Sequence, residues 1–215
     1  MTGAKQNRQG DATRARLVKT AERLFAADGV DAVSLRAVNA AAGLGPSSVH
    51  YHFGTKDDLL AAVLLDMGAG VRDRIRVNVD ELAAAPERPG VESLIRAVTD
   101  PYRDLLLRHR TRGMRWMKIV MQIAPQGHPA LDATEQDLRD RLLEQVRRAF
   151  PDTDAARLES RWAIALMGFI QALGRADDWA PGSSGPSGPS VEWLVDFYED
   201  QVAFLIGGVD RLLGR

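Results

Sequence analysis

Hydrogen-bonding side chains are concentrated in eight consecutive residues, 46–53, with the sequence PSSVHYHF. Serine and tyrosine hydroxyls and histidine rings donate and accept hydrogen bonds, which is the chemistry that binds phosphates and base edges. At about 100° per residue of helix, Val49 and Phe53 share one apolar side. The polar residues point away from that side or flank it: Ser47, Ser48, His50, Tyr51 and His52. The segment therefore predicts a short helix with one buried side and a small, polar outer side that fits the DNA major groove.

Other kinds of chemistry have little support in the sequence. His50 and His52 are two residues apart, so on a helix they point in directions about 200° apart and cannot bind one metal ion. There are no cysteines, which excludes disulfides, thiolate metal sites and cysteine nucleophiles. Gly43 and Gly45 lack the third glycine and the preceding strand of a phosphate-binding loop. With no hydrolase or zinc-peptidase motif either, we expect no enzyme activity, no metal and no cofactor.

The elements that must position this segment are helices. Apolar residues recur at three- and four-residue steps almost throughout, which predicts an all-α fold. A first helix is expected at 13–28, and Ser34 is a good N-cap for a second helix at 35–42. A turn at 43–45 then leads to the helix that Pro46 begins. This is the material of a helix-turn-helix, although geometry alone leaves an ordinary amphipathic helical hairpin equally open.

A larger helical body follows these elements. A fourth helix is expected from Lys56 or Asp57 to about residue 84. Further helices are expected at 91–110, bent or split at Asp100-Pro101, and at 113–124, 129–149, 154–176 and 190–213. Residues 177–190 contain the tract PGSSGPSGPS, which cannot bury apolar area and is predicted to be a linker. This layout predicts an N-terminal domain at 1–56 and a larger C-terminal helical domain at 57–215.

Composition limits the partners and the location of the chain. Its 215 residues are 45% hydrophobic and carry a net charge of −1, so they can bury a core but are not uniformly basic. Residues 1–27 nevertheless hold six Lys or Arg residues against two acidic ones. No apolar run approaches the roughly 18 residues of a membrane span, and the first 14 residues lack the apolar centre of a signal peptide. We expect a cytoplasmic protein that does not contact the membrane.

Residues 13–65 resemble the DNA-binding domain of the TetR (tetracycline-repressor-like) family. The resemblance is carried by TRARLVKTAERLFAADG, SLRAV and AAGLGPSSVHYHFGTKDDLL, with Gly29, Gly43, Tyr51, Phe53 and Lys56 at the family's positions. It implies that Arg36 contacts phosphate or base and that Ser47 and Ser48 face bases. Phosphate contacts are implied for Tyr51, His52 and Lys56, with Ser34 and Thr55 as lesser partners and with Arg8 and Arg14 as a basic arm.

Two residues depart from the family pattern. Asn39 stands where alanine is usual, and His50 stands where tyrosine is commonest. His50 remains a candidate DNA contact, one that alters base preference. Among all the candidates only Arg36 can make a bidentate contact to guanine, worth about 1–3 kcal/mol of discrimination. Specificity is therefore expected to depend on Arg36 and on DNA shape as well as on residues 46–53.

The helices expected at 154–176 and 190–213 are apolar on two sides, so each needs two partners. They are either central core helices or an interface with a second copy of the chain. The resemblance implies the second reading, in which the two helices of each subunit form a four-helix dimer interface. A homodimer suits a two-fold DNA site, because paired recognition helices then read half-sites about one DNA turn apart.

The segment at 112–125, RGMRWMKIVMQIAP, is rich in methionine, which suits both an adaptable ligand pocket and an ordinary core. The resemblance implies a small-molecule effector site within residues 91–176. Candidate lining residues are Tyr102, Trp116, Met117, Met121, Trp162, Phe169 and Gln171, with Arg112 or Arg115 available to pair an acidic ligand.

These expectations combine into one function. The chain is expected to be a ligand-responsive repressor that binds a palindromic duplex operator as a homodimer and is released by a small apolar or aromatic effector. One alternative is a ligand-responsive activator. Another is a helical adaptor that binds protein instead of DNA through residues 30–55. The outer face at 46–53 argues against the adaptor because it is poor in apolar anchors.

Overall fold

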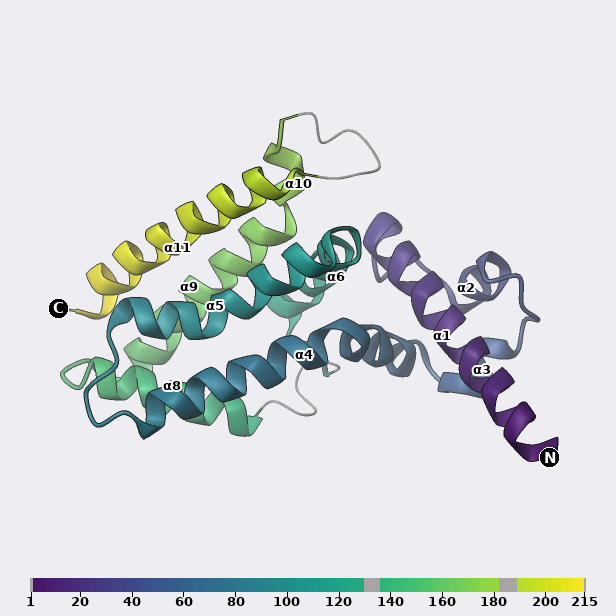
Figure 1. The fold of residues 1–215 in the computed structure, drawn as a ribbon, viewed down its shortest axis with the longest axis horizontal. Helices are drawn as coiled ribbons and strands as arrows, with labels where there is room; N and C mark the ends of the chain where they lie inside the picture. Colours follow the sequence, from purple (N-terminus) through teal and green to yellow (C-terminus); the bar gives the residue numbers. More distant parts are fainter. Residues whose placement is uncertain (1, 130–135, 182–188, 215) are drawn as a thin grey trace.

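The structure, a computed structural model, describes residues 2–129, 136–181 and 189–214. These ranges are mainly helical and contain no strand, which confirms the all-α fold. In chain order the elements are α1 (Thr2–Asp28), α2 (Leu35–Ala41), α3 (Ser48–Phe53), α4 (Lys56–Ala84), α5 (Val91–Arg108), α6 (Arg110–Ile123), the 3-10 turn η1 (Ala124–Gln126), α8 (Gln136–Ala149), α9 (Ala155–Gly174), α10 (Ala176–Trp179) and α11 (Val191–Leu213). Helices α1–α3 lie at one end of the long axis and α11 ends at the other (Figure 1).

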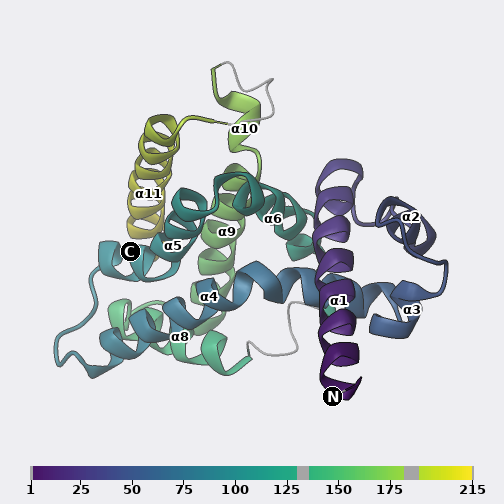
Figure 2. The same ribbon diagram turned by 45° about the vertical axis from the view of Figure 1, so that its right-hand side comes forward.

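α1 is longer than the sequence predicts, because it begins at Thr2 rather than near residue 13. Its core contacts begin only at Leu17 and continue through Ala21 and Phe25, all fully buried. Residues 8–16 are exposed or half-buried, so this part of the helix carries no apolar periodicity to detect. Its Ala, Gln and Arg residues favour helix by intrinsic propensity. The extra turns project beyond α3 (Figure 2).

α4 links the two parts of the molecule. It begins with a capping box, in which Thr55 Oγ1 accepts a hydrogen bond from Asp58 N and Asp58 Oδ2 accepts one from Thr55 N, both at 3.1 Å. The helix then runs unbroken to Ala84, as predicted. It contacts α1 and α3 near its start and α5, α6 and α8 in the body. A single helix therefore contacts both parts of the molecule.

The predicted split at Asp100-Pro101 is wrong, because α5 is one continuous helix through Pro101. Proline has no N–H to donate to the carbonyl four residues earlier, which leaves Ala97 O without its helical partner. Asn78 Nδ2 from α4 donates to that oxygen at 2.9 Å. A side chain from a neighbouring helix therefore satisfies the carbonyl that the proline leaves free, and the helix continues. The chain breaks instead at His109, between α5 and α6.

The body packs α9 between α6 and α11, while α11 also lies along α5 (Figure 1). The predicted linker at 177–190 begins later than expected, because residues 176–179 form α10. Trp179 of α10 lies 5.7 Å from the ring of Phe197, a contact that period counting cannot foresee. Residues 182–188 of that linker lie outside the described ranges, as do residues 130–135 at the start of the helix expected from 129. No helix within the described ranges is long and apolar enough to span a membrane.

Candidate nucleic-acid interface

α3 separates an apolar side from a polar side, as the sequence predicts. Val49 is 0% exposed and Phe53 is 9% exposed, whereas Tyr51 is 85% exposed. The other polar side chains are exposed at Ser47 and His50 and half-buried at Ser48 and His52. The helix itself starts at Ser48, two residues later than expected, because Pro46 and Ser47 form a turn in which Ser48 N donates to Gly45 O at 3.0 Å. A short helix thus presents hydroxyl and imidazole groups to solvent.

A buried asparagine joins α2 to α3. Asn39 is only 2% exposed. Its Nδ2 donates to Pro46 O at 2.6 Å, and its Oδ1 accepts from Val49 N at 3.0 Å. Between them the turn passes through Gly43 at φ +62°, a left-handed conformation that favours glycine. The sequence identified Asn39 only as a departure from the family pattern and missed this role, although a polar residue beside the buried Val38 was the available signal.

The remaining predicted contacts differ in how free their polar groups are. Arg36 is exposed, with no hydrogen bond or ion pair to another described residue. Ser34 Oγ accepts from Ala37 N at 3.1 Å and caps α2, which still leaves its hydroxyl hydrogen available. Lys56 Nζ donates to Asp31 O at 3.1 Å. Thr55 Oγ1, besides its capping bond, donates to Asp58 Oδ2 at 2.6 Å, so this hydroxyl is occupied by helix capping.

His50 is anchored by one ring nitrogen. Its Nδ1 lies 2.7 Å from Gly54 O, and because a carbonyl oxygen only accepts, Nδ1 carries the hydrogen. Nε2 of the neutral ring is then an acceptor on an exposed side chain. Next to it, the rings of Tyr51 and His52 meet edge-on at 5.1 Å. The outer face of α3 therefore offers both hydrogen-bond donors and hydrogen-bond acceptors.

Basic residues of α1 lie near α3. The guanidinium of Arg14 lies 4.8 Å from the centre of the Phe53 ring. This arginine therefore packs against the last residue of α3 as well as carrying charge. Arg8 is exposed near the projecting end of α1. Further along α1, Arg16, Lys19 and Arg23 line a shallow groove of about 340 Å³. The basic residues that the sequence clusters at its start thus lie along one helix beside α3.

An ionic joint connects this end of the molecule to the body. Glu22 of α1 is 2% exposed, and its Oε2 accepts from Arg112 Nε at 2.9 Å. Arg112 also donates to Asp66 of α4 at 2.6 Å, and Arg115 Nη1 lies 3.8 Å from Glu22 Oε1. The hydrogen bond to Glu22, followed by that to Asp66, raises the pKa of Arg112 against the opposing effect of burial. Arg112, expected as a partner for an acidic ligand, is thus already paired within the chain.

A second contact lies at the other end of α6. Gln122 Oε1 accepts from Val30 N at 2.9 Å, just past the C-terminus of α1. The side-chain amide of Gln122 therefore holds the loop that leads from α1 to α2. α6 therefore contacts the N-terminal helices at two places, at Glu22 of α1 through Arg112 and at Val30, just past α1, through Gln122.

Comparison with known proteins agrees with this geometry. Residues 17–63 match the model of bacterial regulatory proteins of the tetR family, and residues 96–208 match the tetracyclin repressor-like C-terminal domain. The chain belongs to the TetR family. The TetR-family regulator UidR of Escherichia coli K12, named an HTH-type transcriptional regulator, is 24% identical over 178 residues, 82% of this chain and 88% of UidR.

Solved structures of TetR-family regulators share the fold. The fatty acid degradation regulator FadR from Bacillus halodurans superposes with a TM-score of 0.58 at 14% identity, covering 91% of this chain and 95% of FadR. NalD of Pseudomonas aeruginosa superposes with a TM-score of 0.54 at 20% identity, covering 90% of this chain and 97% of NalD. At these identities the agreement concerns the fold.

In this TetR-family chain, three of the candidate pocket residues form an aromatic cluster in the body. The ring of Tyr102 lies 6.1 Å from Trp116 and 5.8 Å from Phe169. Trp116 Nε1 donates to Leu64 O at 3.0 Å. Trp116 also approaches α4 so closely that a Cβ on Gly68 would lie 2.6 Å from its ring. The cluster connects α5, α6 and α9 to α4.

The other four candidates lie on α6 and α9, which pack together. Gln171 Nε2 donates to Met121 O at 2.9 Å, and Met117 is fully buried. Trp162 is 3% exposed, and its Nε1–H has no acceptor among the described residues. None of the seven candidates lines the groove of about 480 Å³ that runs between α4 and α5, past Met67 and Leu105.

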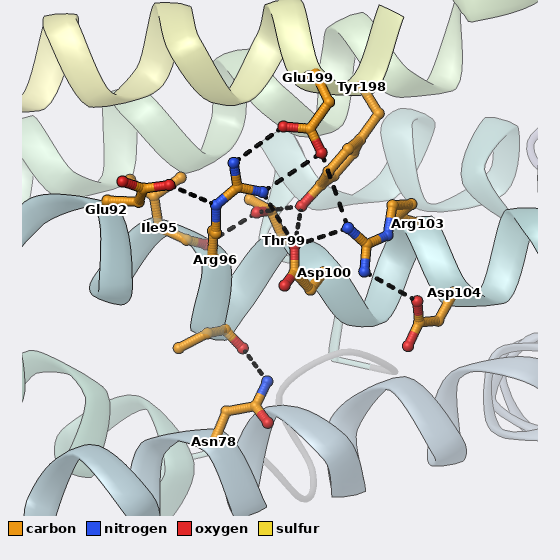
Figure 3. A network of polar contacts seen from close by, with 11 residues as sticks. Asn78, Glu92, Ile95, Arg96, Thr99, Asp100, Arg103, Asp104, Tyr198 and Glu199 are labelled. Atoms are coloured by element: carbon orange, nitrogen blue, oxygen red, sulfur yellow. Dashed lines mark hydrogen bonds and ion pairs between the residues drawn. The ribbon is translucent and has the colours of Figure 1, made fainter. Parts of the chain in front are cut away.

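Polar residues that the sequence did not single out lie beside the aromatic cluster, between α5 and α11 (Figure 3). Tyr198, next to the Phe169 ring at 6.4 Å, donates to Asp100 Oδ1 at 2.5 Å and meets Thr99 Oγ1 at 2.9 Å. Burial, followed by the hydrogen bond to Asp100, raises the pKa of Tyr198, so its hydroxyl stays protonated. Arg96 bridges Glu92 and Glu199 at 2.8 and 2.9 Å. The i,i+4 spacing of Glu92, Arg96 and Asp100 on α5 is a local signal. Their partners Tyr198 and Glu199 lie about a hundred positions away, where no local pattern could have found them.

Proposed function

We propose that this chain is a TetR-family repressor that binds a palindromic operator as a homodimer through the outer face of α3. The observation that carries the proposal is that α3 is buried on one side only. Val49 and Phe53 anchor that side, and the opposite side is polar and exposed. Ser47, Ser48 and His50 would meet base edges, and Tyr51, His52 and Lys56 would meet phosphates. Arg36, exposed and unpaired within the described chain, would supply the bidentate guanine contact.

The proposed dimer surface is formed by α9 and α11. Ile164 on α9 is 65% exposed and Phe204 on α11 is 75% exposed, although both are large and apolar. Small residues near them on the same helices are also exposed, namely Ala163, Gly168, Ala203 and Gly207, and so is Asp200, one turn before Phe204. The two helices pack against each other (Figure 1), and we propose that their exposed apolar side chains form one surface. Contiguous exposed apolar surface of this kind is typical of protein–protein contacts, and two copies of the pair make a four-helix contact.

The proposed effector site is the region of the seven candidate residues, between α5, α6 and α9. The buried Trp162 Nε1–H supports this assignment, because an indole donor without an acceptor costs free energy that a ligand oxygen would recover. The apolar and aromatic character of most of the seven candidates favours a flat, apolar effector that carries a hydrogen-bond acceptor. α6 packs against α9, and it also contacts α1 through Arg112 and the residues just past α1 through Gln122. An effector that displaces α6 would therefore reposition α1 and α3 and change the spacing of the two recognition helices.

DNA binding is tested by selecting bound duplexes from a random pool and titrating the selected duplex at several salt concentrations. With about six to ten phosphate contacts per dimer, affinity should fall about a thousandfold or more between roughly 50 and 200 mM salt. Arg36→Ala should relax the preference at one base pair of each half-site. An absence of any selected duplex would reject DNA binding and favour the adaptor alternative.

The direction of regulation needs a separate measurement. Transcription in vitro from a promoter that overlaps the selected operator should fall on addition of the protein. A rise instead would establish the activator alternative without affecting the proposed interface.

A further inference from the structure

Asn39 occupies the place where α2 meets the first turn of α3, and it touches the recognition helix on both sides of its start. Its Nδ2 donates to Pro46 O at 2.6 Å, just before the helix. Its Oδ1 accepts at 3.0 Å from Val49 N, inside the helix. With 2% exposure, the side chain is out of reach of DNA.

The contact with Val49 N replaces a local helix cap. The first N–H groups of a helix have no partner within it, and a serine at the N-cap normally accepts from one of them. Ser47 holds the N-cap position of α3, yet its side chain makes no capping hydrogen bond. Of the N–H groups in this turn, that of Ser48 is taken by Gly45 O and that of Val49 by Asn39. The capping acceptor thus comes from α2 rather than from α3.

This arrangement determines what Ser47 can do. A capping serine turns its oxygen toward the N–H groups of its own helix. Because Asn39 supplies that oxygen from behind, the Ser47 hydroxyl is exposed and uncommitted on the outer side of α3. The same two bonds fix the distance and angle between α2, which carries Arg36, and α3. We infer that Asn39 is a positioning residue for operator recognition, which caps α3 from α2 and thereby leaves Ser47 free to contact DNA.

The inference rests on the proposed function, the binding of duplex DNA through α3. It predicts an effect on specificity and not on charge. Asn39→Ala removes both bonds but no basic residue, so attraction to DNA of any sequence should be unchanged. Contacts to base edges need correct placement, and losing the equivalent of one such contact changes discrimination by about tenfold.

The experiment measures Kd for the selected duplex and for a scrambled duplex of the same length. Asn39→Ala is expected to lose about tenfold in the ratio of the two affinities, with its affinity for scrambled DNA within about twofold of wild type. Asn39→Ser keeps a neutral hydroxyl at this buried position but is too short to make both bonds, so its loss should be intermediate. Asn78→Ala is the matched control, because it removes a side-chain bond to a helix carbonyl far from α3 and should leave the ratio unchanged.

Two results would overturn the inference. The first is an Asn39→Ala protein that is folded by circular dichroism and keeps the wild-type affinity ratio; should that variant not fold, the same result with Asn39→Ser decides. The second is a lowered Tm in Ser47→Ala, because it would show that Ser47 caps the helix itself. The Ser47→Ala measurement needs no DNA, so it remains decisive even where no duplex is selected, a result that rejects the proposed function instead.

Discussion

The N-terminal three helices and the helical body hold their candidate functional residues in opposite ways. The candidate DNA contacts outside α1 lie within residues 34–56, and most of them are exposed. The candidate effector contacts extend from Tyr102 to Gln171 on three helices, and most of them are buried. A surface that reads a large rigid partner can be built on one short element, whereas a site that surrounds a small molecule needs walls from several. The first kind leaves a local pattern in the sequence, and the second does not.

The two regions also differ in what fixes their helices. Around α3 the fixing bonds are short-range contacts from side chain to backbone, made by Ser34, Asn39 and Thr55. In the body they bridge distant helices, such as the Arg96–Glu199 pair and the bond from Asn78 to Ala97. The joint at Glu22 and Arg112 is where the two systems meet. The following substitutions test this contrast from the largest expected effect to the smallest.

Phe204→Asp should give the largest effect, because it places a charge at the centre of the proposed dimer surface on the body. Central aromatic residues of interfaces contribute about 2–4 kcal/mol or more, and a carboxylate from each subunit adds the cost of desolvation. We expect a monomer in analytical ultracentrifugation and loss of operator binding, with the fold retained because the side chain is 75% exposed.

Leu107→Asp, at an exposed apolar position on α5, serves as the control and should remain dimeric. A dimeric Phe204→Asp would show that the exposed apolar face of the body has no role in assembly. The exposed Ile164 and Phe204 could then no longer be explained by a dimer contact.

Arg112→Met should destabilise the fold by about 3 kcal/mol, because it leaves the buried Glu22 carboxylate without its main partner. This figure is at the low end for a buried pair, since Arg112 is one-third exposed and Arg115 lies 3.8 Å from Glu22. Glu22→Gln should cost less, about 1.5 kcal/mol, because Arg112 keeps Asp66.

Urea unfolding measures both values, with Arg141→Met as the control at a surface pair with Asp80. If Glu22→Gln proved as costly as Arg112→Met, burial of the carboxylate would not be the cause. Operator affinity at a temperature where both variants are folded then shows whether the joint also transmits changes from the body to α3.

Asn78→Ala should cost about 1 kcal/mol, because Ala97 O then has no donor where Pro101 interrupts the ladder of α5. Thermal unfolding measures the effect. Restoring the backbone donor with Pro101→Ala in the same chain should recover most of the loss. Unchanged stability in the single variant would mean that water satisfies this carbonyl as well as Asn78 does.

Glu199→Gln should have the smallest effect, below about 1 kcal/mol, because the Arg96–Glu199 pair is partly exposed. The hydrogen bond from Arg96 lowers the pKa of Glu199 from its ordinary value of 4.5. The pair therefore contributes stability above that value, and the contribution is lost as pH falls through the lowered pKa. Wild type should exceed Glu199→Gln in stability at pH 7, and the two should converge as the pH falls through the lowered pKa of Glu199. A difference in stability that does not shrink as the solution is acidified would assign the effect to packing.

The sequence predicted much of the fold and the two sides of α3, and the failures have physical causes. Residues 8–16 add turns to α1 without burying a face, so periodicity missed them. Pro101 is a strong local signal for a break, but a tertiary contact from Asn78 overrides it. The phosphate contact of Thr55 stays a prediction, and the structure adds that its hydroxyl also bonds Asp58 in the capping box.

The sequence by itself determined the all-α fold, the family and the apolar and polar sides of α3, because each depends on residues a few positions apart along one helix. Only the tertiary structure decided the pairing of Glu22 with Arg112, the capping of α3 by Asn39 and the network around Tyr198. Two of these join groups some 90 or more positions apart, and even Asn39 reaches Val49 only because Gly43 reverses the chain between them. Such partners are chosen by the packing of whole helices, which a local pattern does not encode.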